Sequence, residues 1–221
     1  MKKFVITILA ASLAMSAVAA DKEVEDLLTK MRKAYKEVKT ATFTLESTLL
    51  SGNGDIVVTL KGGFKAPNKM YADIKSAEFK MKFISDGKTI FLIDSANDEV
   101  SDIPYSDSNM GRALSVANLE LINFYEWKKQ LSTEKDHNMH DSKLSIRQNE
   151  EWNGKKWTVL EESAPQAGVY VEYYIDPKTH LIWRTVQMTL DKEFIRGDYV
   201  LKQLKIGVKI DDKRFKKPVI T

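Results

Sequence analysis

The residues best suited to metal chemistry lie in one polar segment. His137 and His140 stand three residues apart, and Asp136 and Asp141 flank them. Imidazole and carboxylate groups can hold a divalent cation, but a zinc site needs three or four ligands, often on a His-Glu-x-x-His helix. That pattern is absent, and His180 lies in a separate predicted turn. The sequence therefore favours a solvated loop at residues 136–141 and predicts no metal site and no cofactor.

Catalytic motifs are equally scarce. The chain has no Gly-x-Ser-x-Gly elbow, no Ser-x-x-Lys box, no phosphate-binding loop and no dinucleotide fingerprint, and it has no cysteine that could act as a nucleophile. Its 31 acidic residues are scattered, whereas a glycosidase needs two carboxylates within about 10 Å across a cleft. We therefore predict no catalytic residue and no enzymatic activity. A hydrolase that uses two of the scattered carboxylates is the weakest alternative.

The first twenty residues have the composition of a secretory signal peptide. Two lysines precede an apolar stretch that ends at Met15, and a small-residue cleavage site follows before Asp21. We predict residues 1–20 to be this signal and residues 21–221 to be a single domain. Removing the signal removes two lysines and no acid, which leaves 201 residues with a net charge of +1.

The remaining composition excludes several classes of protein. Near-zero net charge with both signs interspersed argues against nucleic-acid binding, which needs a basic patch. No later stretch approaches the roughly 18 apolar residues of a membrane span. Without cysteine there is no disulfide and no lipidated N-terminus. These features predict a soluble periplasmic protein without a lipid anchor, whose basic residues 213–217 form a solvated terminus.

Helical patterns occur at the start and in the middle of the mature chain. Val24, Leu27, Met31 and Tyr35 repeat at the three- and four-residue spacing of a helix that buries one side. A second helical pattern, at about residues 108–131, is apolar around much of its circumference. Such a helix must be covered or must cover something.

Alternating apolar and polar residues predict about ten or eleven strands in the rest of the chain. Turn signals at residues 51–54, 85–88 and 153–154 separate some of them, and Gly62 with Gly63 predicts a bulge or a tight bend. No linker divides the pattern. The sequence therefore predicts a mainly β protein with helices (α+β). A single curved antiparallel sheet would form an incomplete β-barrel, with an N-terminal helix and a central helical lid.

The apolar side of these strands is the predicted binding surface. It can be a filled core or a cavity for an apolar ligand, and methionine and aromatic side chains suit an acyl chain. The predicted cavity wall consists of Phe43, Leu45, Val58, Met70, Ile74, Met81, Phe83, Leu92, Ile182, Val186 and Met188. The predicted lid consists of Leu114, Leu121, Ile122 and Phe124 from the central helix.

Short turn motifs and the order of the elements carry a resemblance to a known family. Residues 66–68 (Ala-Pro-Asn) end one hairpin, residues 85–89 (Ser-Asp-Gly-Lys-Thr) open an apolar strand, and residues 211–218 close the chain with a basic run. Behind a signal peptide and a helix, this order resembles the periplasmic outer-membrane lipoprotein carriers, the LolA-like superfamily, over most of the mature chain. This chain departs from the family pattern at one position. The typical carrier has an arginine immediately before the Pro-Asn pair, and that arginine holds the lid shut, whereas this chain has Ala66 there.

The resemblance implies both a fold and a role. The family fold is an incomplete antiparallel β-barrel closed by helices that act as a lid. Its cavity takes the acyl chains of lipoproteins released by an inner-membrane transporter, and the carrier passes them to an outer-membrane acceptor. The resemblance therefore implies a periplasmic carrier of lipoproteins or another lipid. We expect it to be a monomer with no nucleic-acid partner.

One alternative stays open beside the carrier. With a filled interior, the same fold would be a periplasmic protein-interaction or lipid-sensing module without a transport role. Its working surface would then be an edge strand or the lid. The volume of the cavity between the sheet and its helices distinguishes the two interpretations, because a packed interior with no room for an acyl chain would favour the interaction module.

Overall fold

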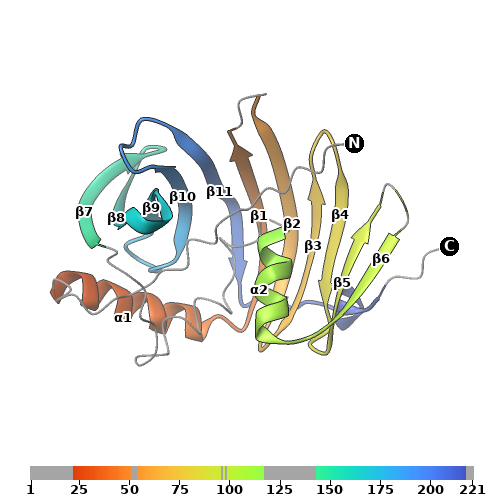
Figure 1. The fold of residues 1–221 in the computed structure, drawn as a ribbon. Helices are drawn as coiled ribbons and strands as arrows, with labels where there is room; N and C mark the ends of the chain where they lie inside the picture. The colour runs from red at the N-terminus through yellow and green to blue at the C-terminus, as the bar shows by residue number, and fades with distance from the viewer. Residues whose placement is uncertain (1–21, 51–53, 96, 98, 117–142, 218–221) are drawn as a thin grey trace.

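One eleven-stranded antiparallel sheet, with a helix at its N-terminal end, forms the body of the protein (Figure 1). The computed structural model describes residues 22–50, 54–95, 97, 99–116 and 143–217. The helices are α1 (Lys22–Glu37) and α2 (Asp107–Val116), with short 3-10 turns η2 (Pro165–Ala167) and η3 (Asp212–Phe215). The strands are β1 (Thr40–Leu49), β2 (Ile56–Lys65), β3 (Lys69–Lys75), β4 (Lys80–Ser85), β5 (Thr89–Asp94), β6 (Glu99–Pro104), β7 (Lys143–Trp152), β8 (Lys155–Ala164), β9 (Val169–Ile175), β10 (Ile182–Thr189) and β11 (Ile195–Ile206).

The sheet consists of two meanders joined by the first and the last strand. Its order is β6-β5-β4-β3-β2-β1-β11-β10-β9-β8-β7. The seam pairs β1 with β11 over its whole length, from Ala41 opposite Ile206 to Leu49 opposite Gly197. Strands β6 and β7 are the two edges and do not pair with each other in the described structure, so the sheet stays open. The predicted mainly β fold with one incompletely closed sheet is confirmed.

The burial of side chains follows the two periodicities seen in the sequence. Along β1 every second residue is buried, namely Ala41, Phe43, Leu45 and Ser47, and the residues between them are half-buried. This is the two-residue period of a strand with one face packed against the core. The apolar side of α1, which includes Met31, is buried as predicted. Hydrophobic burial thus decides which side of each element faces inward.

The glycine pair in β2 serves close packing, not a bulge. Register continues without a shift through Gly62 and Gly63 on both sides of β2. A Cβ atom on Gly62 would lie 2.3 Å from the backbone oxygen of Tyr71 and 2.8 Å from the ring of Phe43. A Cβ atom on Gly63 would lie 2.7 Å from the Tyr71 ring, on the other side of the sheet. Of the two predicted alternatives the bulge is therefore wrong, because the pairing is continuous and the glycines make room for two aromatic rings.

The two turn motifs that carried the family resemblance contact each other. Asn68 donates from Nδ2 to the carbonyl oxygen of Gly87 over 3.1 Å, and Ser85 donates from Oγ to the carbonyl oxygen of Asn68 over 2.9 Å. Asp86 closes its own turn by accepting from the backbone of Lys88 and Thr89. Side chains of this kind stabilise turns by taking up backbone donors and acceptors. The two motifs thus have a structural role, because their hydrogen bonds hold the β2–β3 turn against the β4–β5 turn.

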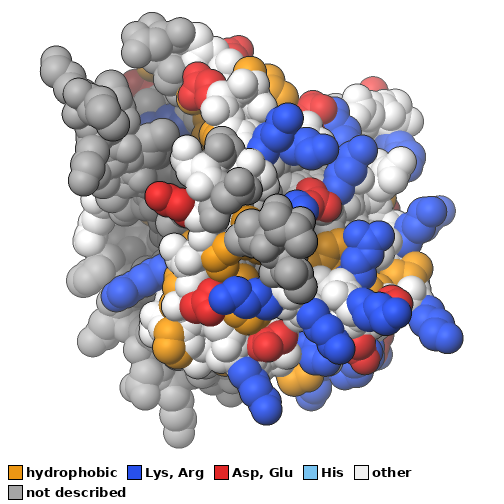
Figure 2. All heavy atoms as spheres, turned by 90° about the vertical axis from the view of Figure 1, so that its right-hand side faces the viewer, with side chains coloured by type: hydrophobic (Ala, Val, Ile, Leu, Met, Phe, Trp, Pro, Cys, Tyr) orange, Lys and Arg blue, Asp and Glu red, His pale blue; other side chains and the backbone are white. Residues whose placement is uncertain are grey.

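The basic C-terminal stretch is anchored to the sheet through Phe215. Phe215 is 1% exposed and meets the Tyr71 ring edge to face, with 5.6 Å between ring centroids. Asp212 accepts from Lys65 over 2.8 Å, and Lys217 pairs with Asp102 over 2.7 Å. Figure 2 shows the lysine- and arginine-rich side of the molecule to which this stretch belongs. The basic side chains of this stretch are solvent-exposed as predicted, whereas Phe215 between them is buried and holds the stretch against the sheet.

Candidate functional site

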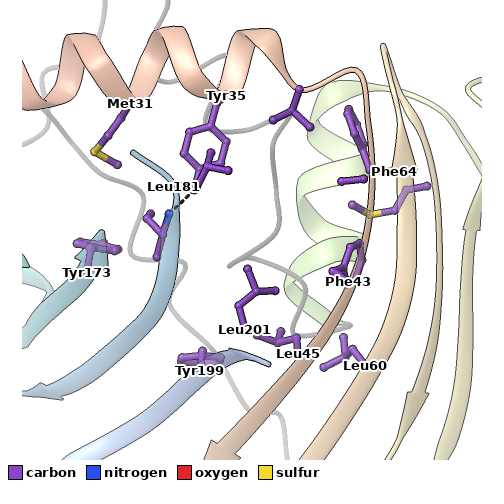
Figure 3. Packing of buried hydrophobic residues seen from close by; sticks show 14 of the residues in the cluster. Met31, Tyr35, Phe43, Leu45, Leu60, Phe64, Tyr173, Leu181, Tyr199 and Leu201 are labelled. Atoms are coloured by element: carbon purple, nitrogen blue, oxygen red, sulfur yellow. Dashed lines mark hydrogen bonds between the residues drawn. The ribbon is translucent and has the colours of Figure 1, made fainter. Parts of the chain in front are cut away.

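The candidate site is the face of the sheet that bears Phe43 and Leu45, here called the helix-covered face. Its buried side chains form one continuous cluster that also takes in residues of both helices. Figure 3 shows Met31 and Tyr35 of α1 pointing toward this face, which carries Phe43, Leu45 and other residues of the cluster. Met31 is 0% exposed. The cluster is an apolar interior bounded by the sheet and its helices.

Tyr35 joins α1 to the second meander. Its hydroxyl oxygen accepts from the backbone N–H of Ile182 over 3.1 Å, at the start of β10. Burial raises the pKa of the Tyr35 phenol far above its usual value, and the hydrogen bond from Ile182 opposes this rise only in part. The phenol therefore stays neutral, and it holds the helix against the sheet by a directed contact as well as by packing.

We expect Tyr35→Phe to lower the free energy of unfolding by about 1–3 kcal/mol, because the buried N–H of Ile182 would lose its acceptor. Chemical denaturation followed by circular dichroism measures this change. Lys36→Ala, on the exposed side of the same helix, is the control and should change stability by less than about 0.5 kcal/mol. Equal effects of the two substitutions would contradict the role of the hydroxyl.

Nine of the eleven predicted wall residues lie on the helix-covered face. Seven are buried members of the main cluster: Phe43, Leu45, Val58, Met70, Ile74, Phe83 and Ile182. Met81 and Leu92 are partly buried and pack against it. Leu60, Leu201 and Tyr199 belong to the same cluster but were absent from the predicted wall. Eight of the nine lie on β1 to β5, which pair with one another without a register shift, so one alternation holds along these strands.

Val186 and Met188 are corrections to the predicted wall. Both lie in a separate cluster with Tyr170, on the other side of β10 from the main cluster. The register between β10 and β9 shifts between Ile182 and Arg184, which inserts one residue and reverses the alternation along the rest of the strand. A one-residue shift moves every later side chain to the opposite face. The prediction was wrong because it extended a single parity from Ile182.

The predicted lid falls mostly outside the described residues. Leu114 lies in α2, whereas Leu121, Ile122 and Phe124 lie outside the described part of the chain, as do residues 1–20 and the two histidines at 137 and 140. Within α2, Met110 and Ala113 are buried members of the main cluster. The first turns of the predicted central helix therefore do pack against the helix-covered face.

Several polar residues of this face were not predicted. Ser47 and Thr185 are buried on it, and Glu162, which is 1% exposed, accepts from the hydroxyl of Tyr173 over 3.0 Å. Ser47 and Glu162 lie on the inward parity of their strands, whereas Thr185 turns inward only because of the register shift after Ile182. They were passed over because hydroxyl and carboxyl side chains in a strand usually mark the solvent side.

The opposite face of β7 to β10 carries a network of charges. Arg147 contacts Glu161 and Glu172, and the Tyr170 hydroxyl donates to Glu161. Burial raises the pKa of the Glu161 carboxyl, but hydrogen bonds from Tyr170 and Ser145 and the charge of Arg147 outweigh it, so this pKa lies below its usual range. The network is a structural feature of this face and lies on the side away from the apolar interior.

The lowered pKa of Glu161 sets the direction of a pH effect. A carboxyl with a lowered pKa stabilises the fold above its unfolded pKa, about 4.3, and this contribution is lost as the pH falls. We expect Glu161→Gln to lower the free energy of unfolding at pH 7 by about 1 kcal/mol, because Arg147 is partly exposed. Denaturation curves of wild type and variant should converge between about pH 5 and pH 3. A constant difference would contradict this assignment.

Possible metal ligands and possible membrane spans were compared with the described ranges. Those residues contain no group of three or more histidine, aspartate or glutamate side chains that could hold a metal ion. Neither helix there has the length and apolarity needed to cross a membrane. The arrangement that remains is an open antiparallel sheet packed against helices around an apolar interior.

Solved structures share this arrangement, although no family model and no curated protein matches the chain. The crystal structure of MucB matches 90% of this chain and 64% of that chain, with 12% identity and a TM-score of 0.56. The complex of MucA and MucB from Pseudomonas aeruginosa matches 89% of this chain and 61% of that chain, with 10% identity and a TM-score of 0.52. These likenesses concern the fold alone, and the chain spans about three fifths of the MucB structures.

A LolA superfamily protein is also among the structural neighbours. NE2245 from Nitrosomonas europaea matches 87% of this chain and 97% of that chain, with 10% identity and a TM-score of 0.43.

Proposed function

We propose that this protein is a periplasmic carrier that binds the acyl chains of lipoproteins, or of another lipid, between its sheet and helices and shuttles them toward the outer membrane. The observation that carries the proposal is the continuous apolar cluster of the helix-covered face. An acyl chain that enters such an interior gains about 0.8 kcal/mol for each CH₂ group removed from water. Binding of this kind needs no catalytic residue, cofactor or metal. The carrier acts as a monomer and leaves the lipid chemically unchanged.

Release is the harder step for such a carrier, because a long acyl chain buried in full would bind too tightly to leave unaided. The helices must therefore yield, or an acceptor must compete for the chain. Among the described side chains, Met110 and Ala113 of α2 belong to the main cluster, and α1 contributes five buried residues, of which Tyr35 is also hydrogen-bonded to the sheet. Movement of either helix away from the sheet would open a way for an acyl chain to enter and leave.

Titration with a fluorescent fatty acid tests the carrier function. We expect saturable binding at one site, competition by an unlabelled long-chain fatty acid, and no competition by acetate, which has the carboxylate without the chain. Chromatography of the recovered lipid should show it unchanged, in keeping with binding and not hydrolysis. Fluorescence that rises linearly without saturation, or a hydrolysed lipid, would count against a carrier.

A second candidate function, protein interaction, is favoured by exposed apolar side chains at one end of the sheet. Seven large apolar side chains of the described residues are exposed, and six of them lie at hairpin ends that share one end of the sheet: Leu50, Val57, Phe79, Leu190, Phe194 and Ile195. The backbone N–H of Leu50 donates to the carbonyl oxygen of Arg196 over 3.2 Å, so two of these hairpins adjoin. Phe194 is 67% exposed on a turn closed by Thr189. Exposed apolar residues gathered in this way mark contact surfaces.

Site-specific photocrosslinking in cells tests this second function. A crosslinker at position 194 should capture one defined protein, in the manner that MucB forms a complex with MucA. The matched control is position 206, because Ile206 is also exposed but lies at the opposite end of the sheet. Equal crosslinking from both positions would argue against a specific surface at the hairpin ends.

A further inference from the structure

Four side chains with hydroxyl groups form one row across the helix-covered face. Ser47 on β1 pairs with Tyr199 on β11, and Tyr199 in turn pairs with Thr185 on β10. Thr185 then pairs with Tyr173 on β9. Directly paired residues of an antiparallel sheet point to the same side, so the four side chains share one face. The row therefore lies within a surface that is otherwise mainly apolar.

Two hydroxyl groups of this row have no hydrogen-bond partner within the described part of the chain. Ser47 is 0% exposed and Thr185 is 6% exposed, yet among the described residues neither Oγ of Ser47 nor Oγ1 of Thr185 has a partner. Buried hydroxyls are nearly always hydrogen-bonded, and leaving one unpaired is costly. Alanine and valine would fill the same places without that cost. Two unpaired donors on the inward face therefore indicate a polar group that binds there.

The spacing of the two hydroxyls limits what that group can be. Ser47 and Thr185 are separated by two strand spacings, which is about 10 Å. One water molecule is too small to bridge them, and a buried water needs two or more polar partners of its own. A ligand that carries two acceptors, joined to apolar chains, fits both the spacing and the surroundings. The next inward pair beside the row, Leu45 and Leu201, is apolar and buried.

We infer that this row is a subsite for the ester groups of a diacylated lipid, an inference that rests on the proposed carrier function. Ser47 and Thr185 donate to ester carbonyl oxygens of the diacylglyceryl group. The acyl chains then lie along β1 to β5, against Leu45, Leu60 and Phe83, where the face is apolar. The subsite thus sets the direction in which the lipid enters, with its head near β10 and β11.

The test compares ester and ether lipids on matched variants. The probes are a dipalmitoyl lipopeptide, dipalmitoyl phosphatidylethanolamine, and the dialkyl ether of each, which keeps the chains but lacks the carbonyl oxygens. The double variant combines Ser47→Ala with Thr185→Val in one protein. The control variant is Thr44→Val, on the other side of β1. Affinities come from competition with a fluorescent fatty acid, and thermal unfolding of each variant verifies that it folds.

Wild type and Thr44→Val should bind the esters about tenfold more tightly than the ethers, because the site loses its acceptors with an ether. The double variant should lose this preference while its affinity for the ethers and its thermal midpoint stay the same or rise. A lipopeptide and a phospholipid that show the same preference would place the recognition in the shared diacylglyceryl group. An unchanged ester preference in the double variant overturns the subsite but leaves the carrier function standing. Failure of wild type to bind any of the probes overturns both.

Discussion

Gly62→Ala should lower the free energy of unfolding by about 3 kcal/mol, the largest effect that we expect from any single added methyl group in this sheet. The new Cβ atom would lie 2.3 Å from the backbone oxygen of Tyr71 and 2.8 Å from the Phe43 ring. Backbone cannot move aside as a side chain can, so the β2 and β3 strands would have to separate. For a chain of this size the melting temperature should fall by roughly 10 °C in a thermal scan.

The neighbouring glycine provides the matched control for this effect. A Cβ atom on Gly63 meets only side-chain atoms of Tyr71, the nearest at 2.7 Å, and that ring can turn away. Gly63→Ala should therefore cost less than about 1.5 kcal/mol. If both substitutions destabilise the protein equally, close approach of the strands at Gly62 is not what requires the glycine.

Met81→Glu should weaken the binding of a long-chain acyl probe at least tenfold, which is about 1.4 kcal/mol or more. Met81 packs against the main cluster from the helix-covered face of β4 but is only partly buried. A carboxylate there can reach water when the protein is empty, so the fold should tolerate it. A bound acyl chain would cover the carboxylate and strip away its water, and that cost falls on binding.

Lys82→Glu is the control, because it places the same charge on the same strand but on the exposed face. Its affinity for the probe should match that of wild type in the same fluorescence titration. Circular dichroism of both variants establishes that they are folded. Equal affinities for wild type, Met81→Glu and Lys82→Glu would show that the acyl chain does not pass the β4 side of the interior.

The strands and the first helix were accessible to sequence reasoning because burial repeats along them with a regular period. The strand β6 shows little such periodicity, since its residues Glu99–Pro104 are mostly exposed and include few apolar side chains. An edge strand buries little, so its sequence shows little alternation. Register shifts are invisible in sequence for a related reason. The extra residue between Ile182 and Arg184 depends on how β10 meets β9, and it reversed the assignment of Val186 and Met188.

The apolar residues of the candidate site could be predicted from the sequence, whereas its polar residues could not. Leu45, Ile74 and Phe83 follow from alternation and hydrophobicity alone. The row through Ser47, Tyr199 and Thr185 depends instead on which strands pair, and β1 meets β11 across almost the whole length of the chain. Hydroxyl side chains that look like solvent-facing residues in sequence become an inward row only once that pairing is known.

Native mass spectrometry of the protein purified from a periplasmic extract tests the carrier function most directly. A carrier with an apolar interior should leave the cell with lipid bound, so a fraction of the protein should show the added mass of one acyl lipid. Delipidated protein should regain that mass when incubated with the same lipid. Protein that carries no lipid, together with no saturable binding of a fluorescent fatty acid, would contradict a carrier and favour the protein-interaction function.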